Sequence, residues 1–338
     1  MEKDAGAGKE FYFQWHLTER CNLHCTHCYQ STSLTSELAI EDLFLVVGEL
    51  ERALTAWQRI GTLSLTGGEP FLRRNDLFAL MNRIDSSPAF QYYDILTNGS
   101  LLAKDNIALL RAHKKLRRVQ VSIEGATAQS NDAIRGAGSF DTTIRAIHLL
   151  DSGGIPASVM VTLSRRNLAE IGPIVDLAAR HGVSTLAFER LIPEGRGMTM
   201  SDQILSPEEL RSAFATIFDH AMRPSPVRIL LYRPLYAYFS QEDPTVGALC
   251  SAGNNALTLM PDGTVYPCRR LPIPIGNVLA DGLFSIWYGS DVLWTLRNPT
   301  KLAGKCRGCH LLTNCRGCRA MAYFSCGDYM AEDPQCWI

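Results

Sequence analysis

The distribution of the cysteines constrains this chain more than any other sequence feature. Three of the eleven lie at Cys21, Cys25 and Cys28, and the other eight lie between Cys250 and Cys336. Disulfide scaffolds are usually short secreted chains whose cysteines are spread through the loops. This chain has 338 residues, an odd number of cysteines and a polar N-terminus without a secretion signal. We therefore interpret the cysteines as metal ligands in a cytoplasmic protein.

The composition excludes several classes of function. Apolar residues make up 46% and charged residues 20% of the chain, as in ordinary globular proteins. The 33 basic and 34 acidic residues nearly cancel, and no basic tract is present, so we expect no nucleic-acid partner. No apolar run reaches the ~18 residues that a membrane span needs, so we expect no membrane partner.

The N-terminal part of the chain alternates β-rich runs with amphipathic stretches, which predicts βαβ units and a parallel sheet. A complete eight-unit barrel needs about 250 residues, so six units predict an α/β fold built on a partial (β/α)6 barrel of the TIM type. The expected strands are Phe11–His16, Thr62–Leu65, Tyr92–Leu96, Val119–Ile123, Ala157–Leu163 and Thr185–Phe188. The expected helices are Ile40–Gln58, Asp76–Ile84, Lys104–His113, Phe140–Asp151 and Leu168–His181.

The repeat ends after Arg190 in a stretch rich in proline and glycine. A helix is expected over Ser206–His220, with Ser206 as its N-cap. A β-hairpin is expected over Leu257–Tyr266, around a Pro-Asp-Gly turn. We therefore expect three parts: the barrel at 1–200, a helical linker at 201–246, and a small cysteine-rich α+β domain at 247–338.

The first three cysteines have the spacing C-x3-C-x2-C and follow the first expected strand. A closed structural zinc site needs four ligands. Three thiolates on one loop suit a four-iron cubane in which one iron has no protein ligand. Such an iron can bind an outside molecule and pass an electron to it, so the loop predicts redox chemistry.

This spacing at Cys21, Cys25 and Cys28 resembles the signature of the radical S-adenosylmethionine (SAM) superfamily. The resemblance implies a [4Fe–4S] cluster whose open iron binds SAM, and reductive cleavage of SAM to a 5′-deoxyadenosyl radical that abstracts a substrate hydrogen. It therefore implies an oxidoreductase that needs an external electron donor such as flavodoxin or ferredoxin. An iron–sulfur electron carrier or assembly protein is the non-enzymatic alternative.

The second motif is Thr66-Gly67-Gly68-Glu69-Pro70, after the second strand. Paired glycines allow close backbone approach, and a carboxylate can accept from an ammonium group. By resemblance, Gly67, Gly68 and Glu69 hold the SAM amino group, a role that electron storage does not require.

Further cofactor-binding candidates come from the same resemblance, at loop and strand-end positions. His27 takes the aromatic position beside the last cysteine of the loop, near adenine. Glu124 stands where the family usually has aspartate. Contacts with the ribose, carboxylate or adenine of SAM are expected from His27, Asn98, Ser122, Glu124, Arg165, Phe188 and Glu189.

The late cysteines resemble the SPASM domain, which carries up to two auxiliary iron–sulfur clusters. The resemblance assigns one cluster to Cys306, Cys309, Cys315 and Cys336, and the other to Cys250, Cys268 and Cys318. A zinc ribbon at residues 306–318 is the alternative, because zinc also accepts this spacing. The resemblance assigns no role to Cys326. It is the fourth ligand of the second cluster, a catalytic hydrogen-atom donor, or a small buried hydrophobic residue.

The resemblance leaves the substrate open. SPASM enzymes mostly crosslink, epimerise or oxidise peptides and proteins, and a peptide or protein substrate is the favoured interpretation. A haem-biosynthesis decarboxylase that acts on tetrapyrroles is the alternative. Because the first strand starts near residue 11, we expect no leader-binding domain before it, so a leader peptide would need a separate binding protein.

Overall fold

A computed structural model describes residues 9–30, 36–240, 242–243 and 246–338. In these residues one nine-stranded sheet has the order β7-β6-β5-β4-β3-β2-β1-β8-β9. All neighbouring strands are parallel except the β8–β9 hairpin. The strands are β1 Glu10–His16, β2 Ile60–Thr66, β3 Phe90–Thr97, β4 Leu116–Ser122, β5 Ala157–Leu163, β6 Thr185–Arg190, β7 Arg228–Leu230, β8 Ala256–Leu259 and β9 Val265–Tyr266.

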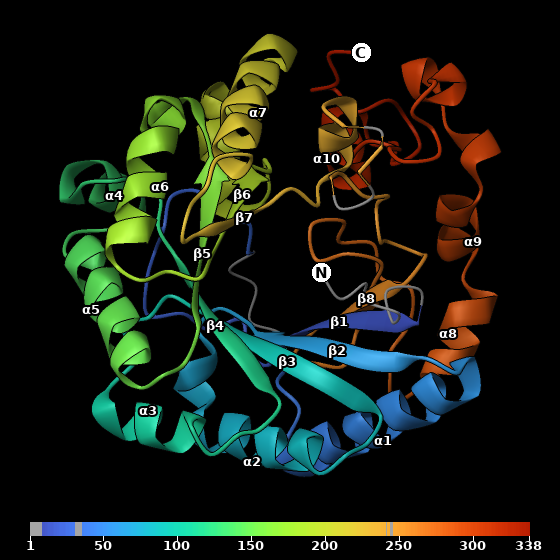
Figure 1. The fold of residues 1–338 in the computed structure, drawn as a ribbon. Coiled ribbons are helices and arrows are strands. Elements are labelled where there is room, and N and C mark those ends of the chain that lie inside the picture. The colour runs from blue at the N-terminus through green and yellow to red at the C-terminus, as the bar shows by residue number, and fades with distance from the viewer. Residues whose placement is uncertain (1–8, 31–35, 241, 244–245) are drawn as a thin grey trace.

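Helices cover the outer side of this curved sheet (Figure 1). Figure 1 shows α1 to α3 under β1 to β4, with α4 to α6 continuing around the outside. Their bounds are α1 Ile40–Trp57, α2 Arg74–Asp85, α3 Lys104–Leu110, α4 Ala128–Arg135, α5 Ser139–Ser152 and α6 Ile171–Arg180. Later in the chain lie α7 Pro207–Ala221, α8 Leu283–Gly289, α9 Asp291–Arg297 and α10 Arg319–Cys326. The six predicted strands and five predicted helices are present, and α4 is an additional short helix.

The two faces of the sheet differ in chemistry because side chains alternate along each strand. On β1, Phe11, Phe13 and Trp15 are buried and belong to the hydrophobic core. Phe11 contacts Trp57 of α1, with ring centroids 4.8 Å apart. The alternate residues of the sheet face the barrel interior and are mostly polar. On β1 to β4 the register aligns Tyr12, Gln14, His16, Thr62, Ser64, Thr66, Tyr92, Asp94, Leu96, Arg118, Gln120 and Ser122 on this face.

Both edges of the barrel sheet are extended beyond the six predicted strands. The segment 201–246, expected to be a helical linker, contains α7 and also β7, which pairs with β6. The predicted hairpin forms β8 and β9, and β8 pairs in parallel with β1. The C-terminal region therefore continues the barrel sheet, and the boundaries of the three parts stay a prediction.

A buried ion pair joins the C-terminal segment to the end of β6. Arg190 and Asp333 form two N–H···O bonds of 3.0 and 2.9 Å. Gln335, two residues further on, donates from Nε2 to the Leu205 carbonyl at 2.9 Å. The carboxyl end of the barrel is thus held against the cysteine-rich region. Among the described helices, none combines the length and hydrophobicity that crossing a bilayer requires.

Candidate functional site

The three-cysteine loop is anchored beside the Gly-Gly-Glu motif at the carboxyl ends of β1 and β2. The backbone pairing of the two strands continues past their ends, because Gly68 donates to the Thr18 carbonyl at 2.7 Å and Glu69 to the Arg20 carbonyl at 2.9 Å. A Cβ atom at Gly68 would lie 2.1 Å from the Arg20 oxygen, and one at Gly67 would lie 2.3 Å from the Thr18 oxygen. The two glycines therefore allow the chain that enters the cysteine loop to pack against β2.

The loop thiols have surroundings that suit an iron–sulfur cluster. The Cys21 sulfur accepts from Leu23 N at 3.4 Å and from Asn98 Nδ2 at 3.6 Å. Burial is the largest cause of the raised pKa of Cys21 and Cys25, and the neighbouring Cys28 thiol adds to both. Hydrogen bonds to ligand sulfurs are typical of such clusters and tune their potentials. The donor set therefore fits a cluster that, when bound, supplies an electron to SAM.

No three Cys, His, Asp or Glu side chains in the described part of the chain converge closely enough to bind a single metal ion. In a four-iron cubane, each thiolate binds a different iron atom.

Glu69 is fully buried and accepts several protein hydrogen bonds. Its carboxylate accepts from Thr97 Oγ1 at 2.8 Å, from Asn98 N at 2.7 Å and from Phe71 N at 3.1 Å. Burial raises the pKa of Glu69, and these hydrogen bonds oppose the increase. Asn98 links this carboxylate to the loop, because its Nδ2 also donates to Asn22 Oδ1 at 2.9 Å. The structure thus brings Glu69, Asn98 and Cys21 together.

A second buried polar group lies beneath the loop. Glu124 is 3.2 Å from His27 Nε2 and 3.6 Å from Arg135 Nη1, and it accepts from Thr162 N at 2.6 Å. The carbonyl of Arg135, the last residue of α4, is 3.9 Å from the Cys25 sulfur. The sequence prediction missed Arg135, because nothing in its local sequence distinguishes a buried arginine from a solvated one.

The other predicted SAM contacts are dispersed. Ser122 ends β4 on the interior face. Arg165 pairs with Glu209 of α7 at 2.9 Å on the surface. Phe188 lies in the hydrophobic core at 2% exposure, because its position on β6 aligns with Val161 on the helix-facing side. Glu189 faces the interior and pairs with Arg233 and Arg270. The sequence prediction missed both of these arginines, because arginine is common on surfaces.

The late cysteines form two groups in space. Burial raises the pKa of Cys250 to about 11, and the nearby Cys318 and Cys268 thiols add to this. Burial also raises the pKa of Cys315 to about 12, with contributions from Cys336 and Cys306. Backbone N–H groups of Leu311 and Gly317 donate to Cys309 and Cys315, both at 3.4 Å. These surroundings fit iron–sulfur ligation. The grouping of Cys250, Cys268 and Cys318, and of Cys306, Cys315 and Cys336, agrees with the assignment made by resemblance, which stays a prediction.

Cys326 differs from the other late cysteines in its exposure. It is the last residue of α10 and is exposed, with its thiol 3.4 Å from the Ala322 carbonyl. An exposed cysteine is not a buried hydrophobe, so that alternative for Cys326 is wrong. Its role as a catalytic hydrogen donor stays a prediction.

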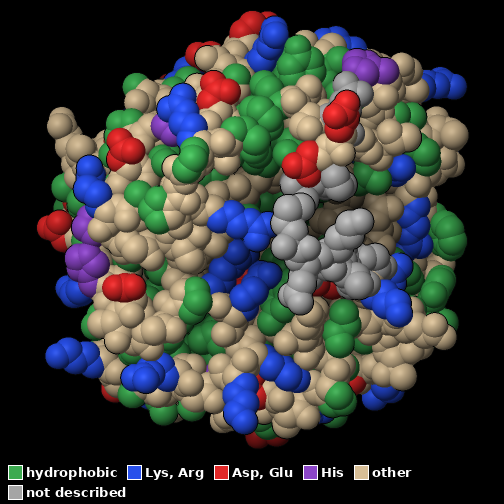
Figure 2. Space-filling model, in the orientation of Figure 1, with side chains coloured by type: hydrophobic (Ala, Val, Ile, Leu, Met, Phe, Trp, Pro, Cys, Tyr) green, Lys and Arg blue, Asp and Glu red, His purple; other side chains and the backbone are tan. Residues whose placement is uncertain are grey.

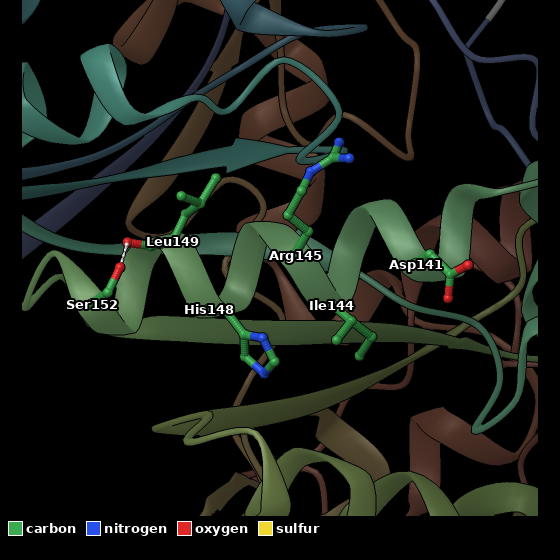
Figure 3. A pocket seen from close by; sticks show the side chains of 6 residues that line it. All are labelled: Asp141, Ile144, Arg145, His148, Leu149 and Ser152. Atoms are coloured by element: carbon green, nitrogen blue, oxygen red, sulfur yellow. Dashed lines mark hydrogen bonds between the residues drawn. The ribbon is translucent and has the colours of Figure 1, made fainter.

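A surface hollow is lined by residues of α5, on the outer side of the barrel (Figure 3). Asp141, Arg145 and His148 contribute polar side chains to it. Since all the residues that line it come from one helix, it is separate from the strand ends that carry the predicted site.

Comparisons with known proteins identify the family. Residues 15–178 match the radical SAM superfamily, and residues 250–319 match SPASM, an iron–sulfur cluster-binding domain. Over 95% of its length, the chain is 33% identical to the AdoMet-dependent heme synthase of Methanosarcina barkeri, covering 95% of that protein. It is 32% identical to the mycofactocin maturase MftC of Mycolicibacterium smegmatis, covering 95% of this chain and 81% of that protein.

The fold also matches solved structures. The structure of anSMEcpe with bound AdoMet and a Cp18Cys peptide superposes with a TM-score of 0.75 at 18% identity, covering 96% of this chain and 93% of that one. The cofactors are a [4Fe–4S] cluster with SAM and auxiliary iron–sulfur clusters in the C-terminal domain, which excludes the zinc ribbon and the simple electron carrier. The chain therefore belongs to the radical SAM superfamily, as an enzyme with a C-terminal SPASM domain.

Proposed function

We propose that this enzyme modifies a peptide or protein, using the 5′-deoxyadenosyl radical to abstract a hydrogen atom from it. The expected products are a crosslinked, epimerised or oxidised residue. The similarity to mycofactocin maturase and the fold match to a peptide-bound enzyme support this proposal.

The polar interior of the barrel is the observation that carries the proposal. The interior-facing residues of β1 to β4 are mostly hydroxyl, amide, imidazole and charged side chains, such as Gln14, Ser64 and Gln120. A peptide backbone offers N–H and C=O groups that such a surface can pair. A flat macrocycle is better held by the predominantly apolar walls found in most cofactor pockets.

A tetrapyrrole decarboxylase is the second candidate. The similarity to the heme synthase favours it, because that relative matches at 33% identity over 95% of both chains. This candidate requires a cavity that accepts a macrocycle alongside SAM.

Deuterium transfer would decide between the two candidates. Reconstituted, reduced enzyme would be incubated anaerobically with SAM and either a pool of perdeuterated peptides or a porphyrin perdeuterated in its propionate side chains. We expect deuterium in 5′-deoxyadenosine from the peptide alone, and none with a Cys21→Ala variant. Transfer from the porphyrin alone would contradict the peptide proposal.

Two partners complete this proposal. An external one-electron donor such as flavodoxin or ferredoxin would reduce the cluster, and a separate protein would bind any leader segment of the substrate. SAM cleavage should continue when reduced flavodoxin takes the place of a chemical reductant such as dithionite. A peptide that is modified at the same rate with and without its leader would contradict the need for a leader-binding partner.

A further inference from the structure

Two arginines share one carboxylate at the interior face of the barrel. Glu189 on β6 forms ion pairs with Arg233 and with Arg270, the latter at 2.7 Å. The three side chains come from the barrel, the segment after β7 and the cysteine-rich region, and are 13%, 29% and 18% exposed. Two guanidinium groups thus meet one carboxylate, and both also interact electrostatically with the nearby Cys268 and Cys318 thiols.

Tyr232 holds this cluster in place. Its hydroxyl accepts from Arg233 Nη2 at 2.9 Å and lies 3.4 Å from Glu189 Oε1. The Arg233 guanidinium also lies over the Tyr232 ring, 4.2 Å from its centroid. The Arg233 Nε atom is buried and has no hydrogen-bond partner among the described residues. The cluster thus keeps an unused N–H donor.

A third guanidinium lies on the interior face of β4. Arg118 on β4 forms an ion pair with Asp94 on β3 at 3.1 Å. Arg117 binds the same carboxylate at 2.5 Å, so the two arginines share one acidic partner. Burial raises the pKa of Tyr232 to about 12, and Arg270 and Arg118 oppose this increase. Figure 2 shows Lys and Arg side chains gathered at the centre of the face, where the barrel interior opens.

Neighbouring arginines have carboxylate partners of their own. Arg190 is matched by Asp333, and Arg269 lies 3.3 Å from Glu194 and 3.8 Å from Glu19. Sharing of one carboxylate by two arginines is therefore a feature of the cluster around Glu189, not of these neighbours. Buried or partly buried charges are costly unless they are paired, and two arginines that share one carboxylate keep N–H donors for a further anionic partner.

We propose that Arg233 and Arg270 bind a carboxylate of the substrate in the barrel interior. Guanidinium groups bind carboxylates through paired N–H···O bonds, which fix orientation as well as contributing affinity. The proposal rests on the proposed function for the position of the substrate. In a peptide the carboxylate belongs to an acidic side chain or the C-terminus, and in a tetrapyrrole to a propionate.

Arg233→Gln tests the site with little risk to folding, because Glu189 keeps Arg270 as its partner. The matched control is Arg180→Gln, which removes an exposed arginine from α6. The binding affinity of reconstituted holoenzyme with SAM would be measured for two pools of coumarin-labelled hexapeptides. One pool contains Asp and Glu, and the other has Asn and Gln at the same positions. A second pair of probes is mesoporphyrin and its dimethyl ester.

We expect the acidic pool to bind about tenfold or more tightly than its amide counterpart. Arg233→Gln should remove this preference, and Arg180→Gln should keep it. If only the porphyrin pair shows an Arg233-dependent preference, the carboxylate site stands but the substrate is a tetrapyrrole.

An absence of any Arg233-dependent preference would overturn the site and leave the peptide proposal to the deuterium experiment. Loss of auxiliary-cluster iron in Arg233→Gln, with the preference unchanged, would also overturn it, since the arginines would then serve the cluster.

Discussion

The buried pair of Arg190 and Asp333 should be the strongest single ionic contact between the barrel and the C-terminal region. Asp333 is fully buried, the Arg190 side chain is 7% exposed, and Asp333 also accepts from the backbone N–H of Cys318 at 2.7 Å. In Asp333→Ala, the guanidinium would keep only Gln335 Oε1, at 3.1 Å, as a recorded side-chain partner. Removing one partner of a buried pair costs roughly 3–5 kcal/mol, so Asp333→Ala should lower the free energy of unfolding by that amount.

The assay is anaerobic urea denaturation of the holoprotein, followed by far-ultraviolet circular dichroism. Asp105→Ala is the matched control, because it breaks the 2.9 Å pair with Arg74 at side chains that are 67% and 39% exposed. Such surface pairs contribute about 0–1 kcal/mol. The double variant Arg190→Met/Asp333→Leu should be more stable than Asp333→Ala, because no buried charge is left unpaired. Equal losses in Asp333→Ala and Asp105→Ala would refute this reasoning.

Three further predictions concern the cluster region. Gly68→Ala should abolish iron binding at the loop, because its Cβ would lie 2.1 Å from a backbone oxygen, whereas Gly48→Ala on α1, where nothing lies within 4 Å, should leave iron content unchanged. Glu69→Ala should weaken SAM binding by roughly 1.5–3 kcal/mol in titration calorimetry while most cluster iron remains, and unchanged affinity would count against a contact with the SAM ammonium. Cys326→Ala should keep all cluster spectra, because the Cys326 thiol is exposed and donates to the Ala322 carbonyl, and a changed auxiliary-cluster signal would show instead that it is a ligand.

The architecture was largely predictable because it depends on short-range patterns. The alternation of β-rich and amphipathic segments predicted the six barrel strands. The position of Cys21, Cys25 and Cys28 directly after the first strand placed their loop at a carboxyl end of the sheet. The pairing of β8 with β1 was not predictable, because it joins residues more than 200 positions apart. Neither was the short strand β7, which has three residues and follows a proline-rich turn.

Individual site residues were harder to predict because tertiary contacts decide which groups a side chain meets. Phe188 and Glu189 are adjacent on β6, but alternation places the first in the core and the second in the interior. Arg165 is bound by Glu209, a helix residue that the sequence did not connect to it. The glycine pair was correctly singled out, but its packing against the chain that enters the loop could only be seen once β1 and β2 were paired.

The central claim is that the loop of Cys21, Cys25 and Cys28 holds the cluster that cleaves SAM. The direct measurement is 5′-deoxyadenosine formed from SAM by reduced protein, compared between the wild type and a variant with all three cysteines replaced by alanine. The wild type should form 5′-deoxyadenosine, and the variant should form none above background while it keeps the iron bound by its C-terminal cysteines. Undiminished cleavage in the variant would contradict the assignment of this loop.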